Sequence, residues 1–146
     1  MALKRLFPKD EVRRRCDRFM QAVELQHLTG LTRIGENFVT NSRLRGSYQD
    51  RTANLRNSTG YTIIINGEVR SMTSQMGEGG TKANEHMKSI VSRKRQAGIT
   101  SIIGVAGMEY AADVESRGYD VITSSTETAL QEQQVMMQNI RKRMSK

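Results

Sequence analysis

The chain has 146 residues and a formal net charge of +8, which suggests acidic partners such as nucleic acid or an acidic protein face. Hydrophobic residues make up 36% of it, below the roughly 45–50% usual for soluble domains, so we expect one domain over residues 1–146 with a thin core. A single cysteine excludes an internal disulfide, and no apolar run approaches the roughly 20 residues of a membrane span, so we expect a cytoplasmic chain with no membrane partner.

The first predicted element is a long helix that follows a short basic lead over residues 1–9. Asp10 is its predicted N-cap, and apolar residues recur at spacings of three and four from Val12 to Val39. A helix of about 30 residues is ~45 Å long, more than so small a domain can cover. We therefore expect either a break near Thr29-Gly30 or one end that projects and packs on a neighbouring molecule.

Arginines crowd the first turns of this helix, at Arg13, Arg14, Arg15 and Arg18. They form either a solvated helix face or a surface that meets nucleic acid or an acidic subunit. Cys16 falls within the apolar face, which predicts a buried, inert thiol. The polar residues 41–49 predict a loop after the helix.

Residues 48–72 carry the most specific pattern in the chain. A polar turn over 49–52 precedes a helix of one or two turns over 53–58, for which Thr52 is the predicted N-cap. Two β-rich segments, 61–65 and 68–72, flank Asn66-Gly67. Asn-Gly supplies the two positive φ angles of a type I′ turn, so the sequence predicts a β-hairpin here.

The region after the hairpin alternates between loop, helix and strand. Residues 73–80 contain three glycines and predict a mobile loop. Thr81 is the predicted cap of a helix over 82–96, with Gly98 at its C-terminal end. The inward residues of this helix are predicted to be Ala83, Met87, Ile90 and Val91.

The last third predicts strands at 99–106 and 119–122 around a short helix or turn over 108–117. Ser124 and Glu127 form a capping box for a final helix that reaches Met144. Its apolar stripe is predicted at Leu130, Met137, Ile140 and Met144, with Ala129 and Met136 beside it, and residues 141–146 form a basic tail. The expected fold is α+β: a small antiparallel β-sheet with the long N-terminal helix and two further helices packed on it.

Catalytic patterns are weak throughout. His27 and His86 lie in helices without an HExxH spacing, and no G-x-S-x-G elbow occurs. Acidic residues near predicted strands suggest a metal-dependent nuclease only in outline, because the required spacing is not met; they are Glu109, Asp113, Glu115 and Asp120. We predict no enzyme, with no catalytic residues, no cofactor and no metal site.

Two short motifs resemble the head–tail joining proteins of tailed bacteriophages, the neck or tail-completion family often classed as minor tail components. Residues 52–59, TANLRNST, are similar to the family segment T-G-x-L-R-x-S-I that leads into a hairpin, with Ala53 at the usual Gly. Residues 110–118, YAADVESRG, are similar to Y-A-x-x-V-E-x-G with one extra residue before the Gly. The Pro-Phe motif that opens the family's last helix is absent, and residues 121–124 stand in its place.

The resemblance implies a structural virion protein, assembled in the host bacterial cytoplasm as a homo-oligomeric ring around the DNA channel. Its partners would be other phage neck, portal-adaptor and tail proteins, with non-specific contact to packaged DNA through Arg13, Arg14, Arg15 and Arg18. The subunit contacts would be made by Arg51, which directly precedes the first motif, by Asn54, Leu55 and Arg56 within it, and by Tyr110, Val114 and Glu115 in the second. Local capping and core packing are the alternative roles for these residues.

A second hypothesis, a small basic nucleic-acid-binding protein, stays open at this point. The net charge of +8 favours it. The few aromatic residues are not interleaved with Arg or Lys, as a base-stacking surface requires, which counts against it.

Overall fold

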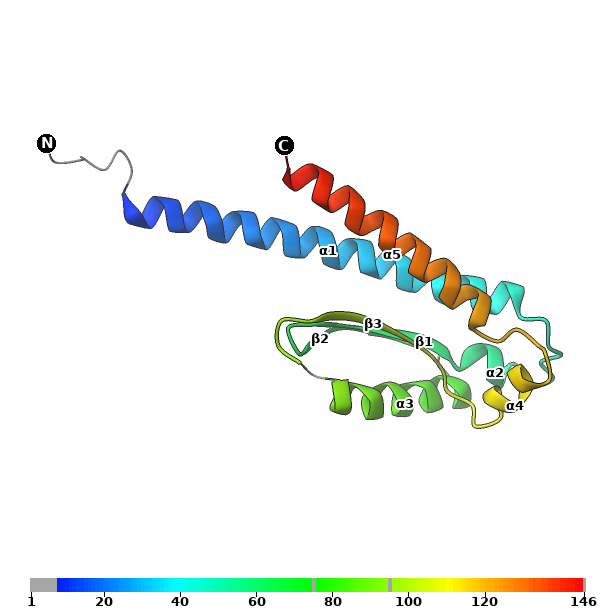
Figure 1. The fold of residues 1–146 in the computed structure, drawn as a ribbon. Helices are drawn as coiled ribbons and strands as arrows, with labels where there is room; N and C mark the ends of the chain where they lie inside the picture. The colour runs from blue at the N-terminus through cyan, green and yellow to red at the C-terminus, as the bar shows by residue number, and fades with distance from the viewer. Residues whose placement is uncertain (1–7, 75, 95, 146) are drawn as a thin grey trace, which may run out of the picture.

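The computed structural model describes residues 8–74, 76–94 and 96–145. Three layers are visible in Figure 1: helix α1 (Lys9–Arg45) above a sheet, helix α3 (Glu78–Lys94) below it, and helix α5 (Thr123–Met144) packed along α1. Two short helices, α2 (Asn54–Asn57) and α4 (Ala111–Ser116), lie together at one end of the molecule. The predicted α+β class is confirmed.

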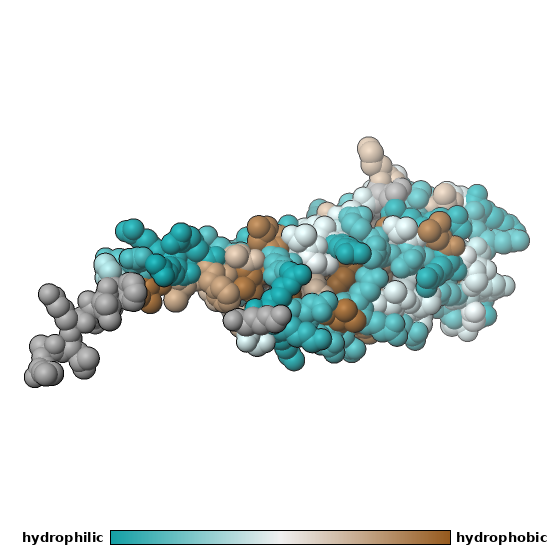
Figure 2. Space-filling view, turned by 90° about the horizontal axis from the view of Figure 1, so that it is seen from above, coloured by the Kyte–Doolittle hydropathy of each residue, from teal (hydrophilic) through white to brown (hydrophobic). Residues whose placement is uncertain are grey.

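Helix α1 is continuous over 37 residues, or about 55 Å, and its N-terminal part projects beyond the rest of the domain (Figure 1). Phe19 is 50% and Met20 63% exposed, and in Figure 2 apolar side chains gather where the projecting part meets the body. Of the two sequence alternatives the projecting end is correct, and a break near Thr29-Gly30 is wrong. Cys16 is exposed because it lies on this uncovered part, so the prediction of a buried thiol is wrong as well.

Both ends of α1 differ from the prediction. Pro8 occupies the N-cap position, and Asp10 lies inside the first turn without a side-chain cap bond. At the other end the helix includes residues 41–45, which were predicted as loop. Val39 and Ser42 are buried, and the Ser42 hydroxyl donates to the Phe38 carbonyl inside the helix, so burial of this last turn outweighs its polar composition.

The described residues form a three-stranded antiparallel sheet in the order β2-β1-β3, from strands β1 (Thr59–Ile65), β2 (Glu68–Thr73) and β3 (Thr100–Ala106). The hairpin prediction is confirmed, since Asn66 and Gly67 have φ angles of 54° and 80°. Residues 119–122 form no strand, so that prediction is wrong: the backbone N–H groups of Val121 and Ile122 donate to the Glu115 carboxylate rather than to a strand.

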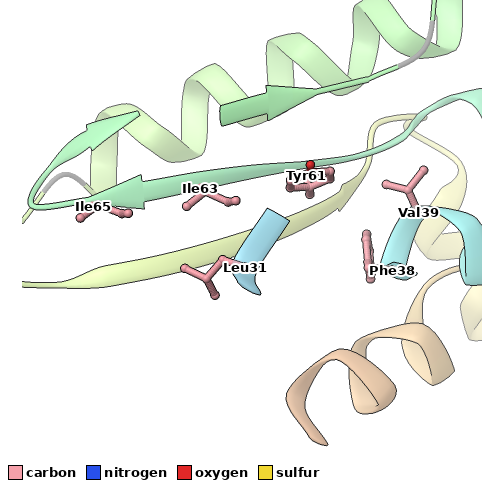
Figure 3. Close-up of a cluster of buried hydrophobic side chains, with 6 residues drawn as sticks. All are labelled: Leu31, Phe38, Val39, Tyr61, Ile63 and Ile65. Carbon is pink, nitrogen blue, oxygen red and sulfur yellow. The ribbon is translucent and has the colours of Figure 1, made fainter. Parts of the chain in front are cut away.

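Strand β1 is buried along its whole length because it is the central strand and both its faces are covered. Tyr61, Ile63 and Ile65 point to the α1 side, where they meet Leu31 and Phe38 in the first core cluster (Figure 3). Alternate residues of a strand point to opposite faces, so the rest of β1 faces α3. There Ala83, Met87 and Val91 are buried as predicted, with Ile90 partly buried beside them.

Helix α3 starts earlier than predicted. Glu78 is its first residue, Thr81 lies inside it and is no cap, and the Thr81 hydroxyl donates to the Gly77 carbonyl. Gly79 and Gly80 are buried in the first turn, and a Cβ on Gly79 would collide with the Asn54 carbonyl oxygen. Gly79 therefore permits a close contact between α2 and α3. The loop predicted over 73–80 shrinks to 74–77, of which residue 75 lies outside the described residues.

Helix α5 is rotated relative to the predicted stripe. Ile140 is buried and Met137 partly buried, whereas Leu130 and Met144 are exposed. Ala129 and Met136, which were predicted beside the stripe, pack against the first core cluster, and Gly30 on α1 leaves room for the Met136 side chain. The Ser124/Glu127 capping box is wrong: Ile122 is the N-cap residue and makes no side-chain cap bond. Among the described helices none combines the length and the apolar content that a membrane span requires.

Candidate subunit-contact site

The first motif folds into a tight turn around helix α2. Asp50 accepts a hydrogen bond from the backbone N–H of Arg56 at 2.9 Å, across six residues. Ala53 has a φ of 59°, a left-handed conformation that glycine adopts without strain. Gly is the usual residue here in the phage segment that residues 52–59 resemble. The backbone of Ala53 therefore has a conformation that this Gly would favour. Thr52 is not the N-cap of α2, which is Ala53.

The turn is fixed to the rest of the fold by short polar contacts. The side chain of Asn54 donates to Glu78 of α3 at 2.9 Å. The hydroxyl of Ser58 donates to the Leu55 carbonyl, and the Ser58 carbonyl accepts from the N–H of Gly107 at 2.9 Å. The turn is therefore held to both α3 and the segment that follows β3.

The second motif packs directly against the first. Tyr48, Leu55, Ala111 and Val121 form a core cluster, with Val114 partly buried against it. A cleft of about 210 Å³ opens at the surface between the two motifs. Its lining comes from the turn and from the second motif: Tyr48, Gln49, Asp50, Arg51, Thr52, Leu55, Tyr110 and Val114. Two motifs roughly 50 residues apart in sequence thus form one surface.

Burial and two nearby carboxylates both act on the tyrosine of the second motif. Burial raises the pKa of Tyr110, and the carboxylates of Asp50 and Glu78 raise it further. Burial also raises the pKa of Tyr48, with the Arg56 guanidinium acting in the opposite direction. The cleft therefore combines aromatic rings and a carboxylate with the exposed Arg51, a chemistry that suits polar protein contacts.

Glu115 has an internal role. Its Oε1 accepts hydrogen bonds from the N–H groups of Val121, Ile122 and Thr123 and from the Thr123 hydroxyl, at 2.9–3.3 Å. Burial raises the pKa of Glu115, but these hydrogen bonds outweigh burial and leave the pKa lowered. Glu115 thus accepts hydrogen bonds at the N-terminus of α5, which is the capping role that was predicted for Ser124.

The seven predicted contact residues therefore separate into two groups. Leu55 is 2% exposed and Val114 is partly buried, so they pack the core, while Glu115 caps α5. Asn54 is bound to Glu78. Arg51, Arg56 and Tyr110 are exposed and are the members available to another molecule; Arg51 and Tyr110 line the cleft, and Arg56 lies on the same turn.

Sequence reasoning missed Asp50, Tyr48 and Glu78, which shape this surface. Asp50 precedes a helix start, and an acid there could have been interpreted as a turn or cap residue. Tyr48 lay in a segment predicted as loop, where burial was not expected. Glu78 was assigned to a glycine-rich loop, and nothing in its local pattern predicts a contact with Asn54.

The four arginines of the first helix turns are all exposed. They share residues 10–24 with four carboxylates, Asp10, Glu11, Asp17 and Glu24, so this segment has no net formal charge. Arg15 pairs with Glu11 at 2.8 Å. The excess positive charge lies elsewhere, for example at Arg93 and Lys94 of α3 and at Arg141, Lys142 and Arg143 of α5.

Comparisons with known proteins give no assignment. No protein-family model, no curated protein and no solved structure matches the chain.

Proposed function

We propose that this chain is a structural component of the phage head–tail junction, which assembles as a ring around the DNA channel. The observation that carries the proposal is the packing of the two resembling motifs into one surface, with Arg51 and Tyr110 exposed in the lining of the cleft and Arg56 exposed on the same turn. Short motifs that match a pattern by chance have no reason to meet in space. The projecting, partly apolar end of α1 also favours a protein that finds cover on other subunits.

The experiment is complementation of a phage that lacks the chain, followed by electron microscopy. Replacing Arg51 and Arg56 with Ser should block joining, so that filled heads and loose tails accumulate. Folding should survive, because the bond from Arg56 to Asp50 uses the backbone N–H and both side chains are exposed. Arg117→Ser, an exposed arginine at the end of α4, is the matched control and should give normal particles. Normal particles from the double variant would contradict the proposal.

A small basic nucleic-acid-binding protein is the second candidate. Its support is the charge distribution, because the last turns of α3 and α5 both carry basic residues. Both helices end toward the hairpin end of the molecule, opposite α2 and α4 (Figure 1). Sequence-selective binding to short duplex DNA by the isolated monomer would favour this candidate over the junction protein.

Three of the four carboxylates that suggested a nuclease make contacts within the fold. Glu115 caps α5, Asp120 accepts hydrogen bonds from the N–H and hydroxyl of Ser124, and Glu109 lies 3.9 Å from the Lys82 ammonium. Among the described residues, no three His, Cys, Asp or Glu side chains gather in a way that could hold a metal ion. We therefore do not propose it.

A further inference from the structure

A groove of about 980 Å³ runs along the line where α5 packs against α1. Apolar side chains from both helices line it, among them Leu25, Val135, Met136 and Ile140. Leu25 is 65% and Val135 56% exposed, so much of this lining faces solvent. An open apolar groove between two helices is a typical receptor for a third helix.

The projecting part of α1 carries a second uncovered apolar surface. Val12, Cys16, Phe19, Met20 and Val23 recur at helical spacing and form one face, which we term the N-terminal stripe. The first four of these residues are exposed, and Val23 is partly exposed. The lining of the groove on α1 starts only at Ala22, so the stripe and the groove are consecutive, different surfaces of the same molecule.

We infer that the N-terminal stripe of one copy of this chain occupies the α1/α5 groove of a second copy. The lengths agree: the stripe spans residues 12–23, or ~17 Å, and the groove lining on α1 spans residues 22–37, or ~22 Å. One contact of this kind covers both exposed apolar surfaces. No contact within a single chain can do so, because the stripe lies on the same straight helix as the groove.

Charge also favours a second copy as the occupant. Residues 10–24 contain four arginines and four carboxylates, of which Glu24 pairs with Arg70 of its own chain, so the incoming helix carries charges of both signs. The groove carries Arg33 and Arg143 together with Glu132, which the Asn37 amide binds at 3.1 Å. A basic helix such as the end of α5 would meet like charge at Arg33 and Arg143, whereas the N-terminal segment of α1 offers both signs.

The interface is heterologous, because two different surfaces of the same chain meet. The two end copies of such an assembly still offer one free stripe and one free groove, so association continues, and it ends in a ring when the rotation between copies closes. The inference deepens the proposed function by naming the contact between neighbouring copies. Its test uses the isolated protein without particles, so the two can fail separately.

The test is a mixing experiment with two single variants, Phe19→Glu in the stripe and Val135→Glu in the groove. Each should leave folding intact, because both side chains are at least half exposed, and each alone should reduce the mass measured by analytical ultracentrifugation to that of a monomer. An equal mixture should recover a dimer of twice the monomer mass, because the intact stripe of the Val135→Glu chain fits the intact groove of the Phe19→Glu chain.

The control is Leu44→Glu, an exposed apolar residue of α1 outside both surfaces, which should associate like the parent protein. A parent chain that stays monomeric would overturn the inference. So would continued association of Val135→Glu alone, which would mean that two stripes pair with each other. Failure of the mixture to form a dimer would overturn it as well.

Discussion

The carboxylate of Glu115 accepts hydrogen bonds from both the backbone N–H and the hydroxyl of Thr123, at 3.1 and 2.9 Å. These bonds join helix α4 to the first residue of α5. The second motif is therefore part of the frame that fixes the last helix, and of its three predicted contact residues only Tyr110 remains exposed. A negative charge at this end of α5 also interacts favourably with the helix dipole.

Removal of this cap should weaken the fold in a pH-dependent way. Glu115→Ala should lower the free energy of unfolding by about 1–2 kcal/mol at neutral pH, as expected for loss of a helix cap. Because the folded state lowers the pKa of Glu115, this stabilisation is complete above its ordinary pKa of 4.5 and disappears as pH falls through the folded-state pKa. Urea titrations at pH 7 and at pH 3 should therefore show a gap between variant and parent that narrows in acid.

The matched control for that experiment is Asp113→Asn, an exposed acid on the same short helix. It should unfold like the parent at both pH values. A Glu115→Ala protein as stable as the parent at pH 7 would contradict the capping role.

Gly35 should be intolerant of a methyl group. A Cβ at this position would collide with the ring of Tyr61, which is buried and donates its hydroxyl to Glu36 at 2.8 Å. Gly35→Ala should cost about 1–3 kcal/mol through overpacking, although alanine is the better helix former. In a Tyr61→Leu background the same change should cost much less, and a double-mutant cycle by denaturant unfolding measures that coupling. Equal costs in both backgrounds would exclude the ring contact as the cause.

The hairpin turn tests backbone conformation alone. Gly67 has a φ of 80°, and a Cβ there would find only ordinary contact at 3.6 Å with Gln96. Gly67→Val should therefore destabilise by roughly 1–3 kcal/mol through strain and not through collision. Asn66→Gly, which removes the side chain at the other positive φ, should melt like the parent or slightly higher. Thermal melts of both variants and of the parent test this prediction. A melting temperature of Gly67→Val equal to that of the parent would show that the turn tolerates a β-branched residue.

The predictable part of the fold rests on local signals. Asn66-Gly67 after a run of β-branched residues predicts the hairpin, and helical spacing locates α1, α3 and α5. The misplaced boundaries depend on tertiary contacts that no local pattern contains. Gly79 lies inside a helix because the Asn54 backbone is close to it, and α1 extends past Val39 because Ser42 is buried against the core.

The candidate site was predicted at the level of motifs, and only in part at the level of single residues. The motifs named the residues that meet at the cleft, but burial then assigned Leu55 to the core and hydrogen bonding assigned Glu115 to a cap. Both outcomes depend on which side of a short helix faces inward. A helix of four or six residues has too few turns to show that periodicity in sequence.

The last prediction concerns DNA. A channel protein must attract phosphate without holding it, so the isolated protein should bind duplex DNA weakly and without sequence preference, with affinity falling steeply in salt. Replacing Arg13, Arg14, Arg15 and Arg18 with Ser should weaken that binding and leave folding nearly intact, because exposed charges contribute little to stability. Replacing Arg141, Lys142 and Arg143 should weaken DNA binding more per cation removed, since these three have no carboxylate beside them in sequence.

Filter binding at two salt concentrations gives the salt slope for each variant, which should decrease in magnitude by about 0.9 for each phosphate that the variant no longer neutralises. Tight, sequence-selective binding by the monomer, unaffected by either set of changes, would contradict both the channel role and this assignment of its cations.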